Sequence, residues 1–282
     1  MAELFSYRDQ DIFVHHSVDQ NPNPDDYNMH AHTSMEIFYF ISGKGKYIVE
    51  GNTYDIHPHD ILIFRSGEMH MILIDHQESY ERLTIHFSPT VFAPVDPSGS
   101  LIMPFIAREL GMHNLFPSTS ENITARKTIY TDFDAYCGMK SDTRVHVLSR
   151  LLSVLVEISD EYNSSPKEHE SKIALSSKII AYINSHLYDD ISLDSICNEF
   201  YVSKSQANRV FKNATEHSIW NYIVLKRLFT ARERLLKNEP ACKVCTECGF
   251  KDYSSFYRAY KSHFGAAPTS VNSEFNLEEK IV

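Results

Sequence analysis

The stretch that decides the fold is LDSICNEFYVSKSQANRVFK, residues 193–212, which recurs in altered form as ACKVCTECGFKDYSSFYRAYK, residues 241–261. Each copy begins with a short amphipathic helix, passes through a tight turn and ends in a second helix with an aromatic residue on its apolar face. Cys197 and Cys245 occupy matching positions, where a small side chain lets the second helix pack closely across the first. This layout predicts two helix-turn-helix units.

The segment between the two copies, residues 218–237, predicts one long helix. Its apolar side chains recur at spacings of three and four residues, which is typical of a helix with one buried face. A stiff connection of this kind would hold the two units at a fixed separation. Gly249 follows the first helix of the second copy, where the backbone often needs a positive φ.

Residues 172–272 resemble the DNA-binding domain of the AraC family of transcription regulators. The resemblance is carried by the motif SKSQANRVFK at residues 203–212 and by Arg227, Ala231, Gly249, Phe250 and Pro268. Glu216 departs from the family pattern, which usually has a glycine at the end of the first recognition helix, whereas Gly265 keeps that glycine in the second. The resemblance implies that double-stranded DNA is a partner.

The second helix of each unit is expected to enter the major groove, where outward-facing side chains reach the base edges. Arginine can pair with guanine, and asparagine or glutamine with adenine, through two hydrogen bonds each. Two units in line would contact successive major grooves about one helical turn (~34 Å) apart. The expected DNA-binding residues are Ser205, Gln206, Asn208, Arg209 and Lys212 in the first unit, and Ser254, Ser255, Tyr257, Arg258 and Lys261 in the second.

Charge is divided unevenly along the chain. Its 282 residues suit about two domains, and the formal net charge is −10. Residues 171–272 hold 14 Lys and Arg against 9 Asp and Glu, a balance of +5, so the remainder carries −15. A basic domain attached to an acidic body is the asymmetry expected when only one domain contacts phosphate.

The sequence gives no sign of secretion or membrane insertion. No basic stretch followed by an apolar core opens it, and no apolar run approaches membrane-spanning length. Five cysteines, an odd number, favour free thiols in a reducing compartment. Cys242, Cys245 and Cys248 lack the fourth ligand of an iron–sulfur run, so we interpret them as small core residues. We therefore expect a cytoplasmic protein with no membrane partner.

The first third of the sequence is typical of a β-sandwich or barrel. Short β-rich runs, separated by turns that contain Gly, Pro and Asp, predict strands within residues 35–49, 60–64, 70–74 and 80–87. In the last of these runs Arg82, Thr84 and His86 alternate with apolar residues. This alternation predicts a strand with one wet face and one dry face.

The same region resembles the cupin jelly roll. Its first sequence motif is matched by His30, His32, Glu36 and Gly43, and its second by Gly51, Pro58, Asp60, Gly67 and His70. Ile74 stands where an asparagine often follows. AraC-family proteins commonly carry such a domain before their DNA-binding part. The predicted fold class is therefore α+β with two domains, an N-terminal cupin-like β jelly roll with flanking helices and a C-terminal all-α domain with two helix-turn-helix units.

The region after the jelly roll is expected to be helical. An apolar stripe at helical spacing runs through residues 144–162, and a shorter helix is predicted near 121–136. The family resemblance suggests that these helices form a homodimer, and the alternative is that they only cover the jelly roll. The predicted segments are a sensing jelly roll at 1–98, a helical extension at 99–163, a polar linker at 164–171, the DNA-binding domain at 172–272 and a tail at 273–282.

The jelly-roll side chains allow two interpretations. AraC-family regulators use this domain to bind a small organic effector, and the resemblance suggests a sugar or another polar metabolite. The expected effector-binding residues are His30, His32, Glu36, Tyr39, His70 and His86, of which Tyr39 has the opposite parity in its strand. In cupin enzymes His30, His32, Glu36 and His70 would instead hold a divalent metal. We favour the sensor, with no catalytic residue, no metal and no cofactor.

The sequence thus predicts a ligand-responsive, sequence-specific DNA-binding transcription regulator and not an enzyme. A ligand would shift the population of DNA-competent arrangements if it binds one arrangement better than the other. Two alternatives remain at this point. One is a metal-dependent cupin enzyme tethered to DNA, and the other is a DNA-binding dimer that does not respond to a ligand.

Overall fold

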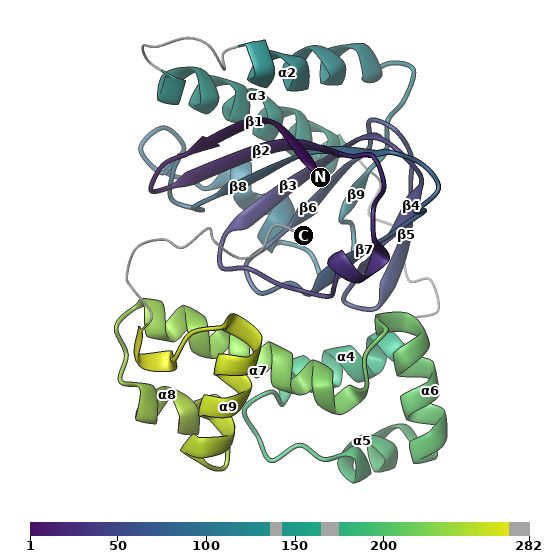
Figure 1. The fold of residues 1–282 in the computed structure, drawn as a ribbon, viewed down its shortest axis with the longest axis vertical. Coiled ribbons are helices and arrows are strands. Elements are labelled where there is room, and N and C mark those ends of the chain that lie inside the picture. The colour runs from purple at the N-terminus through teal and green to yellow at the C-terminus, as the bar shows by residue number, and fades with distance from the viewer. Residues whose placement is uncertain (136–142, 165–174, 271–282) are drawn as a thin grey trace.

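The computed structural model describes residues 1–135, 143–164 and 175–270, which form a β-rich N-terminal domain and a helical C-terminal domain (Figure 1). This arrangement confirms the α+β fold class with two domains. Most of the predicted linker and the whole predicted tail lie outside the described residues.

Two antiparallel sheets make up the N-terminal domain. One has six strands in the order β1-β2-β8-β3-β6-β9, and the other has three in the order β5-β4-β7. The predicted strand region 35–49 is divided by a turn at Gly43, and β1, β2, β5 and β9 lie outside the predicted runs. The strands are β1 (Ala2–Arg8), β2 (Ile12–Asp19), β3 (Met35–Ser42), β4 (Gly45–Val49), β5 (Asn52–Ile56), β6 (Ile61–Phe64), β7 (His70–Ile74), β8 (Tyr80–Phe87) and β9 (Leu115–Phe116).

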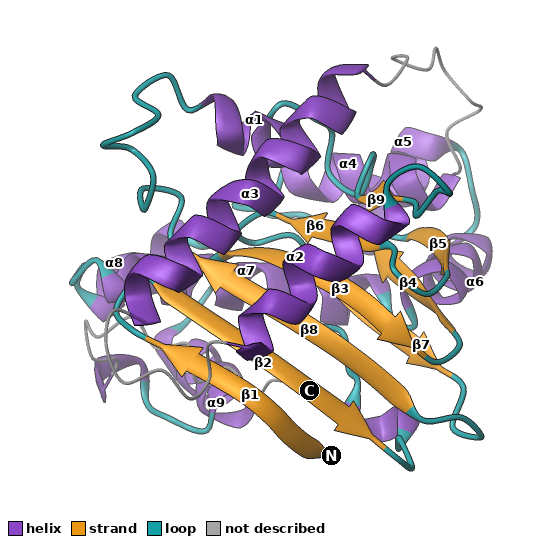
Figure 2. Cartoon of the chain, turned by 90° about the horizontal axis from the view of Figure 1, so that it is seen from above, coloured by secondary structure: helices purple, strands orange, loops and turns teal. Residues whose placement is uncertain are grey.

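The six-stranded sheet is buried on both faces. Its outer face is covered by α2 (Ile123–Ala135) and α3 (Thr143–Ser164), which lie across the strands (Figure 2). Its inner face packs toward the three-stranded sheet through aromatic residues such as Phe38 and Tyr47. The expectation of a wet face on β8 is therefore wrong, because Arg82 is 1% exposed.

The helices α2 and α3 are attached to the sheet by a buried arginine. Arg126 donates to the carboxylates of Glu157 and Glu161, at 2.6 Å each, and to the backbone oxygen of Phe116 at 2.9 Å. The N-terminal domain also contains the short helices η1 (Pro24–Asp26), η2 (Ser100–Ile102) and α1 (Met103–Ile106). The apolar stripe predicted within residues 144–162 faces the sheet, so covering the sheet is one function of this helix.

The C-terminal domain contains the two predicted helix-turn-helix units. The first is α5–α6, the second is α8–α9, and the long helix α7 joins them (Figure 1). Ser218 caps α7 by accepting from the backbone N–H of Asn221 at 3.2 Å, at the predicted start of this helix. The helices are α4 (Leu175–Ser185), α5 (Leu193–Phe200), α6 (Lys204–Thr215), α7 (Ile219–Leu236), α8 (Ala241–Glu247), α9 (Tyr253–Phe264) and η3 (Pro268–Ser270).

The turn of the second unit needs its glycine for two reasons. Gly249 has φ +81°, and a Cβ added there would lie 2.8 Å from Cζ of Arg227. The Arg227 guanidinium donates to the backbone oxygens of Gly249, Leu187 and Asp189. Arg227 therefore fixes α7 against this turn and against the segment before α5.

Helix α6 ends on a strained residue, which gives a stability test. Glu216 adopts the left-handed conformation with φ 59°, whereas the equivalent end of α9 uses Gly265 with φ 73°. We expect Glu216→Gly to raise the free energy of unfolding by about 0.5–1 kcal/mol, because glycine adopts this conformation without strain. Chemical denaturation monitored by circular dichroism provides the measurement.

The matched substitution Gly265→Ala should lower the free energy of unfolding by about 1 kcal/mol. A Cβ at Gly265 would meet no heavy atom within 4 Å, so the backbone strain alone is measured. Equal stability of Glu216→Gly and the parent protein would contradict this account of the α6 end.

Candidate functional site

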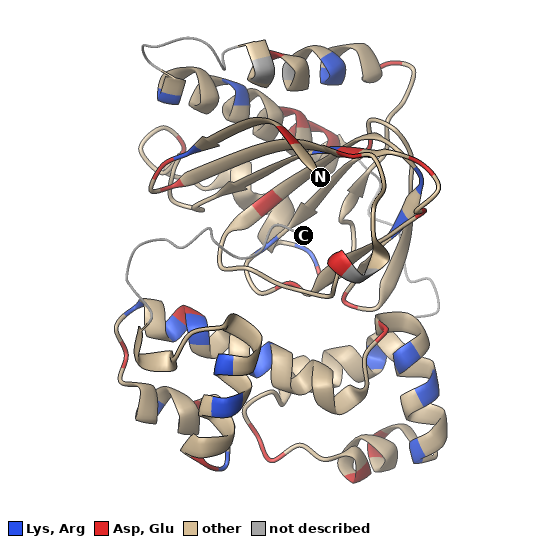
Figure 3. Cartoon of the chain, in the orientation of Figure 1, with Lys and Arg blue, Asp and Glu red and all other residues tan. Residues whose placement is uncertain are grey.

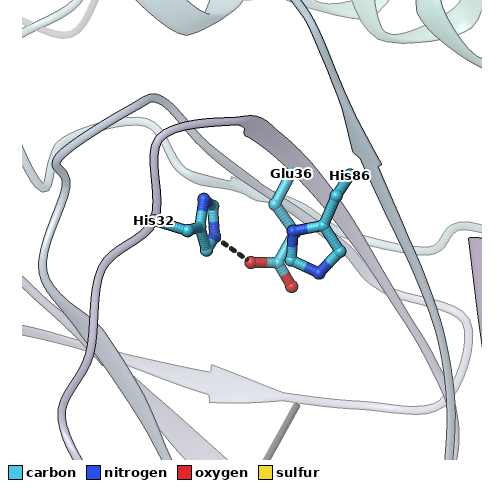
Figure 4. A group of neighbouring side chains, drawn as sticks. All are labelled: His32, Glu36 and His86. Carbon is cyan, nitrogen blue, oxygen red and sulfur yellow. Dashed lines mark hydrogen bonds and ion pairs between the residues drawn. The ribbon is translucent and has the colours of Figure 1, made fainter. Parts of the chain in front are cut away.

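Five polar residues meet between the two sheets of the N-terminal domain, and we call them the histidine cluster. Glu36 on β3 lies directly opposite His86 on β8. His32 lies just before β3 (Figure 4). His30 and His70 exchange backbone hydrogen bonds at 3.0 and 2.9 Å. The space between the two sheets thus brings together five of the six residues that the sequence predicts to bind an effector.

The carboxylate of Glu36 lies at the centre of the cluster. It is 3% exposed, with Oε2 lying 2.6 Å from Nε2 of His32 and 3.2 Å from Nε2 of His70. The His86 ring stacks edge-on against the His32 ring, with centroids 4.8 Å apart. A buried carboxylate is therefore surrounded by imidazoles on several sides.

Hydrogen bonds to the backbone fix the orientation of three of these rings. Nδ1 of His30, His32 and His70 lies 2.8–2.9 Å from a backbone carbonyl oxygen in each case. A carbonyl oxygen can only accept a hydrogen bond, so Nδ1 carries a proton in each ring. Nε2 is then the nitrogen left to interact with Glu36 or with a metal, which is the arrangement found in metal-binding histidines.

Burial and mutual interaction shift the pKa values in the cluster. Burial, with the neighbouring His70, lowers the pKa of His30 to about 3. Burial likewise lowers the pKa of His86 to about 3, although Glu36 opposes the shift. Burial alone would raise the pKa of Glu36, but His86 and the hydrogen bonds from His32 and His70 outweigh it and hold that pKa well below its usual range. At neutral pH the site therefore offers a carboxylate beside neutral imidazoles of His30 and His86.

This donor set fits a divalent metal. One ligand atom from each of His32, Glu36 and His86 lies within 4.8 Å of the others (Figure 4). Imidazole and carboxylate groups suit Fe, Mn, Ni or Zn. The group differs from the quartet considered from the sequence, because His86 joins it across the strand pair, whereas His30 and His70 do not belong to it. When bound, a metal would supply a Lewis acid that coordinates an oxygen of a ligand.

Tyr39 does not belong to the cluster. It lies on the opposite face of β3, where its ring stacks on Tyr130 with centroids 3.7 Å apart. Its hydroxyl lies 2.6 Å from Nδ1 of His59. The prediction that Tyr39 binds the effector with the cluster is therefore wrong. Successive side chains of a strand point to opposite faces, and Tyr39 has the opposite parity to Glu36.

The residues expected to contact DNA lie on the outer sides of α6 and α9. Between them, Ala207 and Phe211 in α6, and Phe256 and Tyr260 in α9, are buried. Lysine and arginine residues are distributed over both helices (Figure 3). Exposed residues are Ser205, Gln206, Arg209, Lys212, Ser254, Ser255, Arg258 and Lys261, whereas Asn208 and Tyr257 are half-buried.

The two domains also meet at a buried charged group, which the sequence did not predict. Glu50, in the turn between β4 and β5, is 1% exposed and accepts hydrogen bonds from Tyr222 and Lys226 of α7. No local pattern marks Glu50, because its partners follow about 170 residues later in the chain. We refer to this interaction as the Glu50 contact.

Comparisons with known proteins agree with this two-domain organisation. Residues 18–99 match the model of the AraC-like ligand binding domain, and residues 196–273 match a helix-turn-helix domain model. The Msm operon regulatory protein of Streptococcus mutans is 25% identical over 246 residues, covering 84% of each chain. The transcriptional activator RhaR of Mannheimia succiniciproducens is 20% identical over 250 residues, covering 88% of this chain and 87% of the relative.

Among solved structures, ToxT from Vibrio cholerae aligns with 92% of this chain and 97% of its own, at 13% identity and a TM-score of 0.39. The sequence matches define a DNA-binding transcription regulator that carries a ligand-binding domain, and its relatives are regulators and not enzymes. The chain belongs to the AraC family of transcription regulators. None of the described helices is long and apolar enough to span a membrane.

The sequence favoured a site without a metal, whereas the donor set of the histidine cluster predicts metal binding that can be measured directly. We expect full-length protein purified without a chelator to carry about one divalent first-row metal ion per chain, because the cluster combines imidazole nitrogens with an ionised carboxylate. His32→Ala and His86→Ala should each lose the metal. Inductively coupled plasma mass spectrometry provides the measurement.

His57→Ala is the matched control, because the His57 side chain is 76% exposed and lies outside the cluster. It should keep the parental metal content. The same metal content in all four proteins would show that the cluster does not hold the ion.

Proposed function

We propose that this regulator senses a small polar molecule, such as a sugar or another polar metabolite, at the histidine cluster, and that the Glu50 contact relays binding to the DNA-binding domain. The observation that carries this proposal is that one short backbone segment, residues 67–70, touches both the cluster and the Glu50 contact.

The Glu50 contact joins both domains through one carboxylate. Oε1 of Glu50 accepts from Nζ of Lys226 at 2.5 Å and from the backbone N–H of Met69 at 2.8 Å, while Oε2 accepts from the hydroxyl of Tyr222. Lys226 also donates to the backbone oxygen of Gly67 at 3.1 Å. The buried carboxylate of Glu50 and the ammonium group of Lys226 compensate each other only while the two domains are docked.

Apolar packing surrounds this charged contact. Gly51 lies so close to α4 that an added Cβ would be 2.5 Å from Cδ1 of Ile180. Side chains from both domains share one apolar cluster, to which Ile48, Met69 and Met71 contribute from the sensor and Ile179, Ile180, Ile183 and Ile223 from the helical domain. Helices α4 and α7 of the helical domain are therefore packed directly against the sensor domain.

Residues 67–70 connect the two sites. His70 contributes its Nε2 to the cluster, and its neighbour Met69 donates its backbone N–H to Glu50. A ligand that binds the His70 side chain and moves it therefore also moves the neighbouring backbone, whose Met69 N–H is hydrogen-bonded to Glu50. Such a ligand changes the docking equilibrium to the extent that it binds the docked and undocked arrangements differently.

We further propose that the protein acts as a homodimer that assembles through α2 and α3. The support is the outer surface of α3, where Val145 is 62% exposed and Val156 is 43% exposed although the helix already covers the sheet. Two double units in a dimer would contact a longer operator than one chain can. The proposed segments at 1–98 and 172–272 supply the sensing and DNA-binding parts.

The proposed DNA contacts predict a change in sequence preference. Arg209→Ala and Arg258→Ala should each cost roughly 1–3 kcal/mol at one base position, because each arginine can pair with a guanine in the major groove. Selection of bound duplexes from a random library, followed by gel shifts at fixed salt, gives the preference of each protein. Lys212→Ala should instead weaken binding to all sequences and reduce its salt dependence. An unchanged base preference in both arginine variants would defeat the assignment.

The Glu50 contact predicts that the two domains unfold together. Glu50→Gln should lower the free energy of unfolding by roughly 3 kcal/mol, because it leaves Lys226 buried without its anion. We also expect one calorimetric transition to separate into two, since the interface that couples the domains is weakened. The double variant Glu50→Gln, Lys226→Met should recover part of the loss, because it removes both charges.

Asp55→Asn is the matched control on the same hairpin. Asp55 pairs with Lys46 at 2.9 Å, but both side chains are more than half exposed, so little change is expected. If Glu50→Gln behaves like Asp55→Asn, the Glu50 contact does not hold the domains together and cannot relay a signal.

A further inference from the structure

A buried arginine lies on the same inner face as the histidine cluster. Arg82 on β8 is 1% exposed, and among the described residues no carboxylate forms an ion pair with it and no atom accepts from its Nη1. Its Nη2 lies 3.4 Å from Sδ of Met1. The guanidinium carbon lies 4.7 Å from the ring centre of Tyr80 and 5.6 Å from that of Tyr27.

These contacts do not replace an anion. A thioether sulfur is a weak acceptor, and aromatic faces offset only part of the cost of burying a cation. Asp19 lies on the same sheet, but its carboxylate accepts from Tyr27 at 3.0 Å and lies 3.5 Å from the Met1 ammonium. Buried charges in proteins are normally paired. Arg82 therefore lacks the kind of partner that its burial calls for.

Two side chains beside Arg82 each have one polar atom without a partner among the described residues, although the other ring nitrogen of His15 lies 3.6 Å from Oε2 of Glu3. Ser17 is directly opposite Arg82 in the β2–β8 pairing, and His15 is directly opposite Thr84. Ser17 is fully buried and His15 is 5% exposed. Oγ of Ser17 and Nδ1 of His15 have no hydrogen-bond partner among the residues that the structure describes. Three neighbouring side chains on one sheet face thus present unused hydrogen-bonding groups.

The electrostatics and geometry of this group suit a carboxylate. Burial, and then the charge of Arg82, lowers the pKa of His15, so at neutral pH the ring is neutral and can donate one N–H. Nη1 of Arg82 offers two N–H groups and Ser17 one O–H, so the group can donate about four hydrogen bonds, which matches the roughly four lone-pair sites of a carboxylate. The planar guanidinium fork also matches carboxylate geometry.

We propose that Arg82, Ser17 and His15 form a subsite for a carboxylate of the effector, so that the sensor domain recognises a carboxylate-bearing polar metabolite, such as a sugar acid, and not a neutral sugar. This inference rests on the proposed sensing function. The subsite and the histidine cluster share β8, where Arg82, Thr84 and His86 follow one another on the inner face at about 6.6 Å per step. The subsite and the cluster therefore lie along the same face of one strand.

The test compares acids with their neutral counterparts on the full-length protein. Thermal unfolding is followed with D-glucuronate against D-glucose and D-galacturonate against D-galactose, at matched ionic strength. A specific ligand raises the unfolding temperature by mass action. We expect at least one acid to raise it more than its neutral partner does. In Arg82→Met the half-saturating concentration of that acid should rise roughly ten- to a hundredfold, because a hydrogen-bonded charge pair is lost.

Two further variants keep the test decisive. Ser17→Ala makes a small change at the same subsite and should weaken the response to the acid even if Arg82→Met folds poorly. Lys127→Met removes an exposed positive charge on α2 and should respond as the parent protein does. Circular dichroism checks that each variant is folded.

The outcomes separate this inference from the sensing function. If a neutral sugar stabilises the protein as well as its acid does, or if the subsite variants respond as the parent does, the carboxylate subsite is refuted and sensing stands. If none of the four compounds stabilises the parent protein, the sugar-acid assignment is refuted, and with it the proposal of a sugar effector.

Discussion

The structure depends on one buried carboxylate that both domains hold in place. Glu50 belongs to the sensor domain, yet two of its hydrogen-bond donors, Tyr222 and Lys226, belong to α7. A carboxylate and an ammonium group excluded from water need each other, so partial separation of the domains is costly. The docked and undocked arrangements are therefore distinct states and not points on a continuum. A ligand can act on such a pair of states by binding one of them better.

Features that depend on local pattern were predictable from the sequence. The two helix-turn-helix units and α7 follow from the spacing of apolar residues and from capping residues such as Ser218, and these signals act within a few residues. The strand parity of Tyr39 likewise indicated its true position away from the cluster. In contrast, Glu216 shows that an absent glycine did not prevent a left-handed end to α6. The surrounding helices supply enough stability to tolerate the strain.

Features that depend on pairing between distant segments were not predictable. The alternation in β8 indicated one polar face but not that a second sheet would bury it, so Arg82 was expected to be solvated. His86 joins the group with His32 and Glu36 only because β8 pairs with β3 in one register. The Glu50 contact joins residues about 170 positions apart, and neither partner differs in pattern from an ordinary surface charge. Burial of polar groups is a tertiary property, and a single sequence does not encode it locally.

Two groups of buried polar side chains along β8 favour ligands of opposite charge. At the histidine cluster, imidazole nitrogens surround an ionised carboxylate, which favours a cation. At Arg82 a guanidinium stands beside unused donors, which favours an anion. A neutral molecule would leave the Arg82 end unpaired, and buried unpaired polar groups give stronger discrimination between ligands than apolar contacts do. Selectivity of the sensor therefore originates in charge that the fold buries without pairing, and the same property makes ligand binding able to change its stability.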